Sequence, residues 1–369
     1  MNLRFDHLLS LLLSVGTLVL VSSVGHAASF DCDKAASATE KTICADSKLS
    51  KLDEKLSGAW TTVSGIKSDP AVTKSSQLQW LKLRNACGAD VSCLIARYNE
   101  RLAALVNAQF PAGADQAGNR LEALLPKDES ADADAGGCTA DKLFCVQIHK
   151  PDNAPSEMRI DYAGASPFSL SFTLPDAAPD ADSEDTGPGA EPGDVTLWPR
   201  VLRPVGDKDA ILVGAVYGTW TSYSGGGGSA SSLRLFRVSR NKAASHDADE
   251  ILSVPIGGSL GIRACFSDED ERKRRGACHD EYNFAATLGL DPTVTSGFPR
   301  LVYQTRATSF PGKVSRYEDS LEKPPLREQD LVTAVNQRCT YKRTFQLESG
   351  SGVYVPDQPL PDCDDYTAP

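Results

Sequence analysis

Residues 30–44 read FDCDKAASATEKTIC, and residues 84–93 read RNACGADVSC. Each stretch ends on a cysteine and carries another cysteine shortly before it, so two cysteine pairs frame the segment between them. The framed segment is rich in helix-forming residues and contains few apolar ones, which limits the core that it can build. Cysteines placed in this way predict a small helical module, over residues 28–110, that is held together by disulfide bonds.

The apolar residues of the framed segment recur at steps of three and four positions, which is the period of one helix face. The stripe consists of Leu49, Leu52, Leu56, Ala59, Trp60, Val63 and Ile66. A further helix is predicted after Asp69-Pro70, because proline is favoured at the start of a helix. Asp90 is placed to cap a last helix, because its side chain can accept a hydrogen bond from the first helical turn.

The first 27 residues have the pattern of a secretory signal peptide. Arg4 supplies the basic start, residues 8–24 carry no charge, and Gly25-His26-Ala27 offers small residues for cleavage before Ala28. No later segment is apolar enough to span a bilayer. We therefore predict a protein that is exported and is periplasmic or secreted.

The predicted mature chain keeps all ten cysteines, and an even number in an oxidising compartment favours disulfide bonds. Their spacing does not match the closely spaced ligands of a zinc site, so we expect no metal and no other cofactor. The cysteines expected to form structural disulfides are Cys32, Cys44, Cys87, Cys93, Cys138, Cys145, Cys265, Cys278, Cys339 and Cys363. The first four allow three pairings, and we favour bonds from the first pair to the second, which would tie the N-terminal segment to the helices.

The formal net charge of the chain is −11. This acidity argues against nucleic acid or an anionic lipid surface as a partner. The charge is uneven, because residues 28–110 hold 11 basic and 9 acidic side chains while residues 111–369 hold 26 and 39. Any electrostatic attraction of a basic partner is therefore expected from the second half of the chain.

The composition changes after the helical module. Residues 111–136 are dominated by Pro, Gly, Ala and Asp, which predicts a linker, with a loose helix over Leu121–Leu125. Residues 137–369 contain short alternating or β-branched runs between turns rich in Gly, Pro, Asp and Ser, which is an all-β pattern. The predicted class is α+β by separate domains, a helical module followed by a β sandwich or a propeller-like domain.

Residues 30–105 resemble the family known as the lysozyme inhibitor LprI N-terminal domain. The resemblance rests on the order and spacing of the four cysteines and of the polar and aromatic residues between them. The family positions are filled by Glu40, Asp53, Gln77, Trp80, Arg84, Tyr98 and Arg101. Two positions depart from the pattern, since Trp60 stands where the family usually has Tyr and Asn85 stands where Asp is common.

The resemblance implies a non-enzymatic envelope or secreted protein that binds lysozyme, or another cell-wall-associated protein, and blocks it by steric occlusion. The acidic second half of the chain would assist the capture of a cationic enzyme. We expect the family residues to be structural, with the aromatic ones in the core and the charged ones in ion pairs.

An alternative hypothesis places the function in the β-rich region, as a carbohydrate- or ligand-binding or hydrolytic unit with the helical module as an adaptor. A pocket lined by Trp198, Trp220, Tyr217 and Tyr223 with convergent carboxylates would favour this hypothesis, and a β surface without any pocket would contradict it. Residues 257–261 read GGSLG, which we interpret as a Gly-rich turn because no helix follows, as a nucleophile elbow requires.

One further cysteine pair frames a charged stretch. Cys265 and Cys278 flank residues 267–276, which read SDEDERKRRG. A hairpin closed at its base by a disulfide would place these charges in solvent, and we interpret the stretch as a solvated turn rather than a recognition loop.

Overall fold

The structure of the chain is a computed structural model. It describes residues 28–64, 66, 70–126, 136–151, 154–164, 167–175, 191–206, 210–239 and 248–369. The predicted signal peptide lies outside the described residues.

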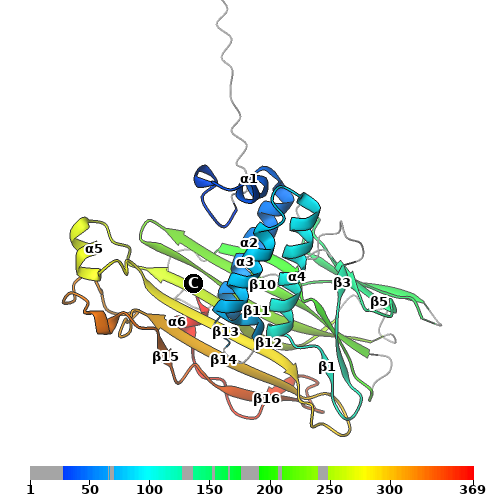
Figure 1. Ribbon diagram of the computed structural model, residues 1–369. Coiled ribbons are helices and arrows are strands. Elements are labelled where there is room, and N and C mark those ends of the chain that lie inside the picture. The colour runs from blue at the N-terminus through cyan, green and yellow to red at the C-terminus, as the bar shows by residue number, and fades with distance from the viewer. Residues whose placement is uncertain are drawn as a thin grey trace, which may run out of the picture.

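The N-terminal part is a module of four α-helices (Figure 1). In chain order its elements are η1 (Cys32–Lys34), α1 (Ala38–Ala45), α2 (Ser47–Val63), η2 (Pro70–Val72), α3 (Lys74–Asn85) and α4 (Val91–Gln109). Each α-helix begins after a residue whose side chain accepts a hydrogen bond from the first turn. These caps are Ser37, Asp46, Thr73 and Asp90, so the predicted role of Asp90 is confirmed.

The remainder of the described chain forms two antiparallel sheets. The larger is 12-stranded, with the order β1 (Gly113–Ala114), β2 (Arg120–Ala123), β9 (Arg200–Arg203), β10 (Ala210–Tyr223), β11 (Gly226–Ser239), β12 (Asp249–Ile262), β13 (Asp280–Leu290), β14 (Leu301–Phe310), β16 (Lys342–Leu347) and β17 (Tyr354–Pro356). Beside this path, β8 (Glu191–Leu197) pairs with β10 and β15 (Ala334–Asn336) pairs with β14. The smaller, 5-stranded sheet has the order β3 (Leu125–Pro126), β4 (Gly136–Cys138), β5 (Phe144–His149), β6 (Glu157–Tyr162) and β7 (Phe168–Thr173). The predicted α+β class is confirmed.

The two sheets stack against each other at one end of the molecule (Figure 1). Alternate residues of β10 show how the larger sheet is buried on both faces there. Ile211, Val213 and Ala215 belong to the core between the sheets, whereas Leu212 belongs to the core on the opposite face. This part of the molecule resembles a sandwich, and the strands of the larger sheet form one continuous path rather than propeller blades.

The larger sheet curls so that its first strands approach a connection far along its length. The backbone N–H of Ala117 donates to the carbonyl of Val294 at 2.8 Å, and Nδ2 of Asn119 donates to the carbonyl of Gly297 at 3.1 Å. Both acceptors lie between β13 and β14. The curl brings residues of β2, β9 and β10 into one apolar core with residues of β13, β14 and β16.

The glycines of residues 257–261 lie inside strand β12, so the interpretation as a Gly-rich turn is wrong. A Cβ at Gly257 would lie 3.0 Å from Cγ2 of Thr62 in α2, and a Cβ at Gly258 would lie 2.1 Å from the carbonyl oxygen of Tyr366. Because the two glycines have no Cβ, the helical module can pack closely on one face of β12 and the C-terminal segment on the other. The sequence signal was ambiguous, since glycine marks close backbone approach as well as turns.

The helical module enters the β-rich part through Phe110, directly after α4. Phe110 is 3% exposed and its ring meets the ring of Trp198 edge to face, with a centroid distance of 5.8 Å. Nε of Arg200 donates to the Phe110 carbonyl at 2.8 Å, and Nε2 of Gln109 donates to the carbonyl of Ile256 at 3.1 Å. The end of α4 is thus part of the core of the larger sheet.

The predicted linker over residues 111–136 is not a linker where the structure describes it. Residues 120–123 form β2, which pairs with β9 over four residues, and Leu121 is 2% exposed. The predicted loose helix at Leu121–Leu125 is therefore wrong. The composition of the segment is typical of a linker, but pairing with a strand about 80 positions away decides its structure. The boundaries between domains stay a prediction.

All ten cysteines form disulfides, each between neighbours in the sequence. The bonds are Cys32–Cys44, Cys87–Cys93, Cys138–Cys145, Cys265–Cys278 and Cys339–Cys363. The favoured pairing from the first pair to the second is wrong. Hydrogen bonds to Asp53 tie the N-terminal segment to the helices instead, since the backbone N–H and hydroxyl of Ser29 both donate to Oδ2 of Asp53.

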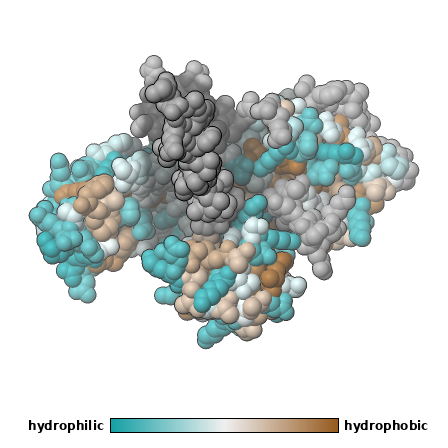
Figure 2. All heavy atoms as spheres, turned by 90° about the horizontal axis from the view of Figure 1, so that it is seen from above, coloured by the Kyte–Doolittle hydropathy of each residue, from teal (hydrophilic) through white to brown (hydrophobic). Residues whose placement is uncertain are grey.

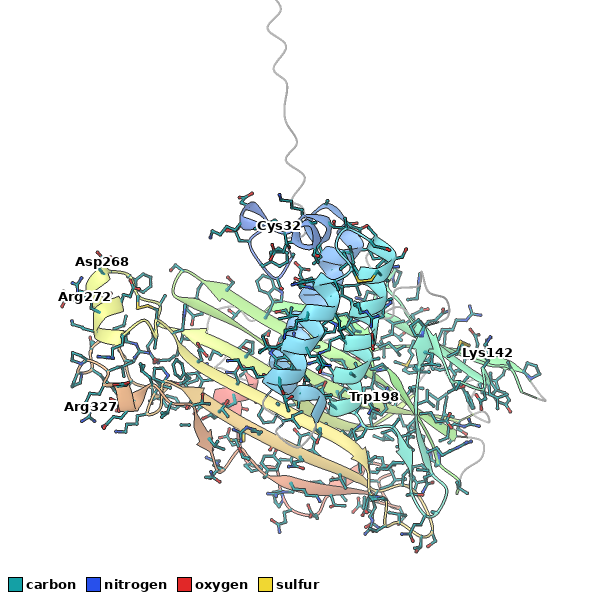
Figure 3. The ribbon with its side chains drawn as sticks, in the orientation of Figure 1. Cys32, Lys142, Trp198, Asp268, Arg272 and Arg327 are labelled. Carbon is teal, nitrogen blue, oxygen red and sulfur yellow. A yellow bond between two sulfur atoms is a disulfide. The ribbon has the colours of Figure 1, made fainter. Side chains whose placement is uncertain are left out.

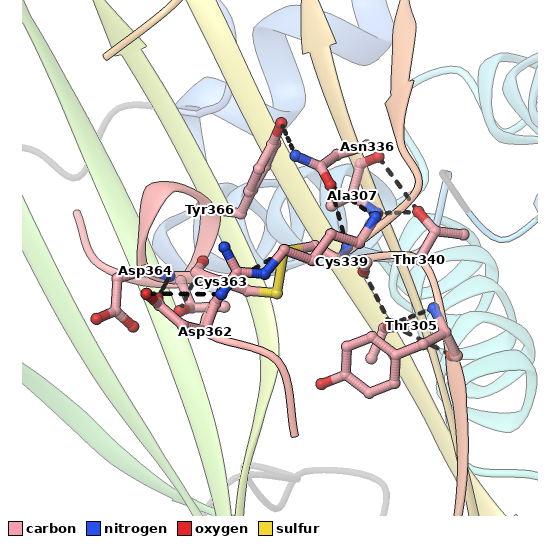
Figure 4. Close-up of a disulfide and its surroundings, with 12 residues drawn as sticks. Thr305, Ala307, Asn336, Cys339, Thr340, Asp362, Cys363, Asp364 and Tyr366 are labelled. Atoms are coloured by element: carbon pink, nitrogen blue, oxygen red, sulfur yellow. Dashed lines mark hydrogen bonds and ion pairs between the residues drawn. A yellow bond between two sulfur atoms is a disulfide. The ribbon is translucent and has the colours of Figure 1, made fainter. Parts of the chain in front are cut away.

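The Cys339–Cys363 bond fastens the C-terminal segment to the larger sheet (Figure 4). Oγ1 of Thr305 in β14 donates to the carbonyl of Cys339 at 2.9 Å. Nδ2 of Asn336 donates to the hydroxyl of Tyr366 at 3.2 Å, in the short helix α6 (Asp364–Thr367). The disulfide closes the longest loop of the five, with a sequence separation of 24.

Removing this disulfide is expected to destabilise the chain more than removing a short one. Because the loss of chain entropy grows with loop length, replacing Cys339 and Cys363 by Ala should lower the free energy of unfolding by about 3–4 kcal/mol. The same change at Cys87 and Cys93, whose separation is 6, should cost about 2 kcal/mol. Urea unfolding of the two double variants measures the difference, and an equal or reversed order would contradict the expectation.

Candidate functional site

Two of the family residues, Arg84 and Tyr98, contact the buried carboxylate of a third, Asp53. Its Oδ1 accepts a hydrogen bond from the hydroxyl of Tyr98 at 2.6 Å and lies 3.6 Å from Nη1 of Arg84. Its Oδ2 accepts from Ser29. Burial raises the pKa of Tyr98 and the hydrogen bond to Asp53 raises it further, so Tyr98 remains a neutral donor. Residues from α2, α3 and α4 are thereby joined in one network.

Trp80 covers this network. Nε1 of Trp80 donates to the carbonyl of Arg97 at 3.0 Å, and the guanidinium of Arg84 lies 5.5 Å from the centroid of the Trp80 ring. The rings of Trp80 and Tyr98 meet edge to face at 5.4 Å. Trp80 and Tyr98 are therefore buried in the core of the module, and their polar atoms form hydrogen bonds within it.

The remaining family residues make two separate contacts. Nε of Arg101 donates to Oε1 of Gln77 at 3.0 Å, and its guanidinium lies 5.4 Å from the centroid of the Trp60 ring. The side chain of Glu40 accepts from the backbone N–H groups of Ser37 and Ala36, which closes the capping box of α1 and lowers the pKa of Glu40. Of the expected ion pairs, Asp53 with Arg84 is formed, whereas Arg101 binds an amide.

These contacts engage the polar groups of the family residues within the module, so a binding partner would contact other side chains. The large apolar side chains that the described part of the module exposes are Leu78, Leu83 and Val91, which are 51%, 48% and 36% exposed. Leu83 lies one helical turn before Cys87, and Val91 lies inside the loop that the Cys87–Cys93 bond closes. The sequence analysis did not identify these residues. Leu78 and Leu83 lie outside the helical stripe that contains Trp80 and Arg84, and that position predicts that both are on the exposed side of the helix.

The exposed end of the module projects beyond the sheet. Helix α4 spans 19 residues, so Val91 lies about 28 Å from the end that is anchored in the sheet. Figure 1 shows α1 at the same projecting end, and Figure 3 places Cys32 there. Figure 2 looks down on this end and shows brown and tan residues among teal ones on the lobe in the lower middle of the view.

The aromatic residues of the alternative hypothesis do not form a pocket. Trp198 is fully buried in one core and Tyr217 lies in the core on the other side of the sheet. Trp220 and Tyr223 are exposed on β10 and point to opposite faces, as an odd separation along a strand requires. Among the described residues these four aromatic side chains therefore line no common pocket, and the alternative hypothesis loses the observation that would favour it.

Ser259 has no catalytic setting in the described part of the chain. It lies inside β12, where the register places it between Ser229 of β11 and Asn283 of β13. Among the described residues, no hydrogen bond joins Ser259 to a histidine or a carboxylate. A nucleophile elbow needs a sharp turn between a strand and a helix, and the extended strand at Ser259 does not provide one.

The charged stretch between Cys265 and Cys278 is more ordered than a solvated turn. Residues 268–274 form the helix α5 (Asp268–Arg274), which Figure 3 shows at one end of the molecule with Asp268 and Arg272 labelled. Arg274 is buried and pairs with the fully buried Asp280, which also lies 2.9 Å from Nη1 of Arg263. The exposed charges at Asp268 and Arg272 agree with the interpretation, and the internal ion pairs explain why the loop is held in place.

The described residues contain neither a candidate metal cluster nor a candidate membrane-spanning helix. Within the described ranges, no cluster of three or more His, Cys, Asp or Glu side chains is arranged to hold a metal ion. None of the helices in that part of the chain has the length and apolarity needed to cross a membrane.

Comparison with known proteins finds similarity over part of the chain. A segment of 80 residues is 34% identical to lipoprotein LprI of Mycobacterium bovis and, equally, of two strains of Mycobacterium tuberculosis. The segment is 21% of this chain and 40% of those relatives, so the match spans well under half of their length. No protein-family model matches the chain, and no solved structure matches it. The similarity to lipoprotein LprI therefore covers about a fifth of the chain, in agreement with the predicted resemblance of a single segment.

Proposed function

We propose that this chain is an exported, non-enzymatic protein that binds a lysozyme-type enzyme through the projecting end of its helical module. The observation that carries the proposal is the separation of the module into two parts. Asp53, Arg84 and Tyr98 form a buried network, whereas Leu83 and Val91 are exposed near the Cys87–Cys93 bond in the sequence. A rigid core beneath an exposed apolar surface is typical of a binding module.

Export is supported by the disulfides, because five such bonds in one chain are typical of an oxidising compartment. The relatives are lipoproteins by name, which places them at an envelope. In this chain Sγ of Cys32, the first cysteine after the predicted cleavage site, is bonded to Cys44. We therefore infer a periplasmic or secreted protein whose Cys32 is a structural cysteine.

The mechanism that we propose is steric occlusion. The projecting end would contact the rim of the partner's active-site cleft through Leu83 and Val91, while the acidic region beyond residue 110 would draw in a cationic enzyme over a longer range. Such steering acts mainly on the association rate and weakens as salt screens the charges.

The test is inhibition of purified chicken-type and goose-type lysozymes by the oxidised chain. Leu83→Asp is expected to weaken inhibition by tenfold or more, because a carboxylate would be desolvated at the centre of the contact. Val355→Asp in β17 is the matched control, since Val355 is 37% exposed and lies outside the helical module, and it should change inhibition less than twofold.

Salt separates the two parts of the mechanism. The association rate should fall steeply between low and high salt, whereas the loss caused by Leu83→Asp should persist at both. No inhibition of either lysozyme by the oxidised chain would overturn the proposal. Equal effects of Leu83→Asp and Val355→Asp would overturn the assignment of the surface.

A further inference from the structure

A cavity of about 270 Å³ lies at the edge of the molecule between the two sheets. It is bounded by β5, β6 and β7 of the smaller sheet on one side and by β9, β10 and β11 of the larger sheet on the other. Lys142, labelled in Figure 3, marks this end of the molecule, which is opposite to α5. The helical module contributes none of the lining residues. The cavity therefore belongs to a site separate from the projecting end.

One wall of the cavity is an aromatic row. Phe144, Tyr162 and Phe168 are direct cross-strand neighbours on β5, β6 and β7. Their ring centroids are 4.8 and 5.3 Å apart, and successive ring planes are tilted by 37° and 35°. The three rings stand side by side along one wall of the cavity, where they offer an aromatic surface to a bound molecule.

The opposite wall is aliphatic. It is formed by Ile211 and Val238, which are 5% and 3% exposed, and by Pro204 and Val205 nearer the surface. Val205 is 46% exposed, so the cavity is buried at its inner end and reaches solvent at Val205. We call this cavity the aromatic slot. A slot with an aromatic and an aliphatic wall removes both faces of a flat ligand from water.

The charges at the mouth of the slot compensate one another. Arg203 lies over the Phe144 ring at 5.3 Å, and its Nη1 binds Asp141 at 2.8 Å and Glu122 at 3.2 Å. Nε of Arg120 binds Glu122 at 3.1 Å. Among the described residues, these two cations are thus each paired with a carboxylate.

This balance holds at neutral pH. Partial burial alone would raise the pKa of Asp141, but hydrogen bonds from Thr139, the Leu143 N–H and Arg203 outweigh it and lower the pKa to about 2. The same two carboxylates raise the pKa of Arg203 against the opposing effect of burial. The Asp141–Arg203 pair therefore keeps both of its charges at neutral pH.

We propose that the aromatic slot binds a neutral planar ring compound, held between the aromatic row and Val205. A volume of about 270 Å³ lies just below the range typical of small-molecule sites, so the slot suits one or two fused rings. A neutral ligand is favoured over an anion because both arginines are already paired. An aromatic ring is favoured over a sugar because both walls are apolar and would leave ring hydroxyls without partners.

The test is calorimetric titration of the full oxidised chain with 1-naphthol as the neutral probe. 1-Naphthoate carries the same ring with a negative charge, and methyl glucoside carries a neutral saturated ring. Saturable binding of 1-naphthol that is at least tenfold tighter than that of the other two is the expected result. Absent saturable binding of 1-naphthol, or tighter binding of the anion or the sugar, would overturn the proposed ligand class.

Two variants locate the site. Val205→Trp should fill the outer half of the slot and weaken 1-naphthol binding at least tenfold, and the partly exposed position tolerates a larger side chain. Phe168→Ser removes one ring from β7, which is the edge strand of the smaller sheet, and should have an effect of the same direction. Val355→Trp, at a position of similar exposure in β17, should leave binding within twofold. Unchanged binding in Val205→Trp, with a native thermal melt, would overturn the location.

Discussion

A chain that carries Asp53→Ala is expected to lose about 3–5 kcal/mol of its free energy of unfolding. Asp53 is 4% exposed, and its carboxylate faces the buried guanidinium of Arg84 and accepts from Tyr98 and Ser29. Removing the carboxylate leaves the Arg84 charge buried with the neutral partners Asn85 and Tyr98. The loss of one partner of a buried pair costs far more than the net contribution of the pair.

The measurement is urea unfolding followed by circular dichroism at the helical signal. Glu100→Ala is the matched control, because Glu100 pairs with Arg97 on the surface and its side chain is 66% exposed. Exposed pairs of this kind contribute less than about 1 kcal/mol. If Asp53→Ala lowers the stability no more than Glu100→Ala does, the network around Asp53 does not hold the module together.

Phe110→Ala is expected to cost about 3–5 kcal/mol as well, through a different mechanism. The substitution would leave a cavity beside Trp198, where the end of α4 meets the core of the larger sheet. Because Phe110 is shared by the helices and the sheet, its loss should also weaken the coupling between them. Calorimetric unfolding should then change from one transition to two, with the helical module unfolding first.

Phe266→Ala serves as the control for this prediction, since Phe266 is 67% exposed and should contribute less than about 0.5 kcal/mol. A single transition in Phe110→Ala, shifted by less than the control, would show that the two parts are coupled elsewhere. The contact between Thr62 and Gly257 would then be the next position to change.

The helical module could be predicted from its sequence because its determinants are local. The apolar stripe of α2 and the cap at Asp90 follow from residue type and spacing, whereas the Asp53–Arg84 pair joins two helices and is not specified by spacing. Side chains three or four positions apart share a helix face, so spacing carries information about burial.

The disulfide prediction failed by favouring distant cysteines over neighbours, and two other failures concern contacts between distant segments. Residues 120–123 have the composition of a linker, but they pair with β9. The GGSLG stretch has the composition of a turn, but its glycines allow α2 and Tyr366 to pack against a strand. Composition reports what a segment can do alone, whereas tertiary packing decides what it does. The same limit applies to the candidate sites, because the aromatic slot depends on a cross-strand register that one sequence does not show.

The joint between α4 and β12 has a consequence for how the chain reaches its native state. The hydrogen bond from Gln109 to Ile256 joins residues 147 positions apart. Gly258 packs closely against Tyr366, which lies far along the chain from it. Contacts of such long sequence separation slow folding, since the entropy of closing large loops is lost before the contacts form. If the chain is exported from its N-terminus, as proposed, Tyr366 emerges long after α4 and β12, and the apolar interior between them stays open until then. During that interval the protein would be most vulnerable to proteases and aggregation.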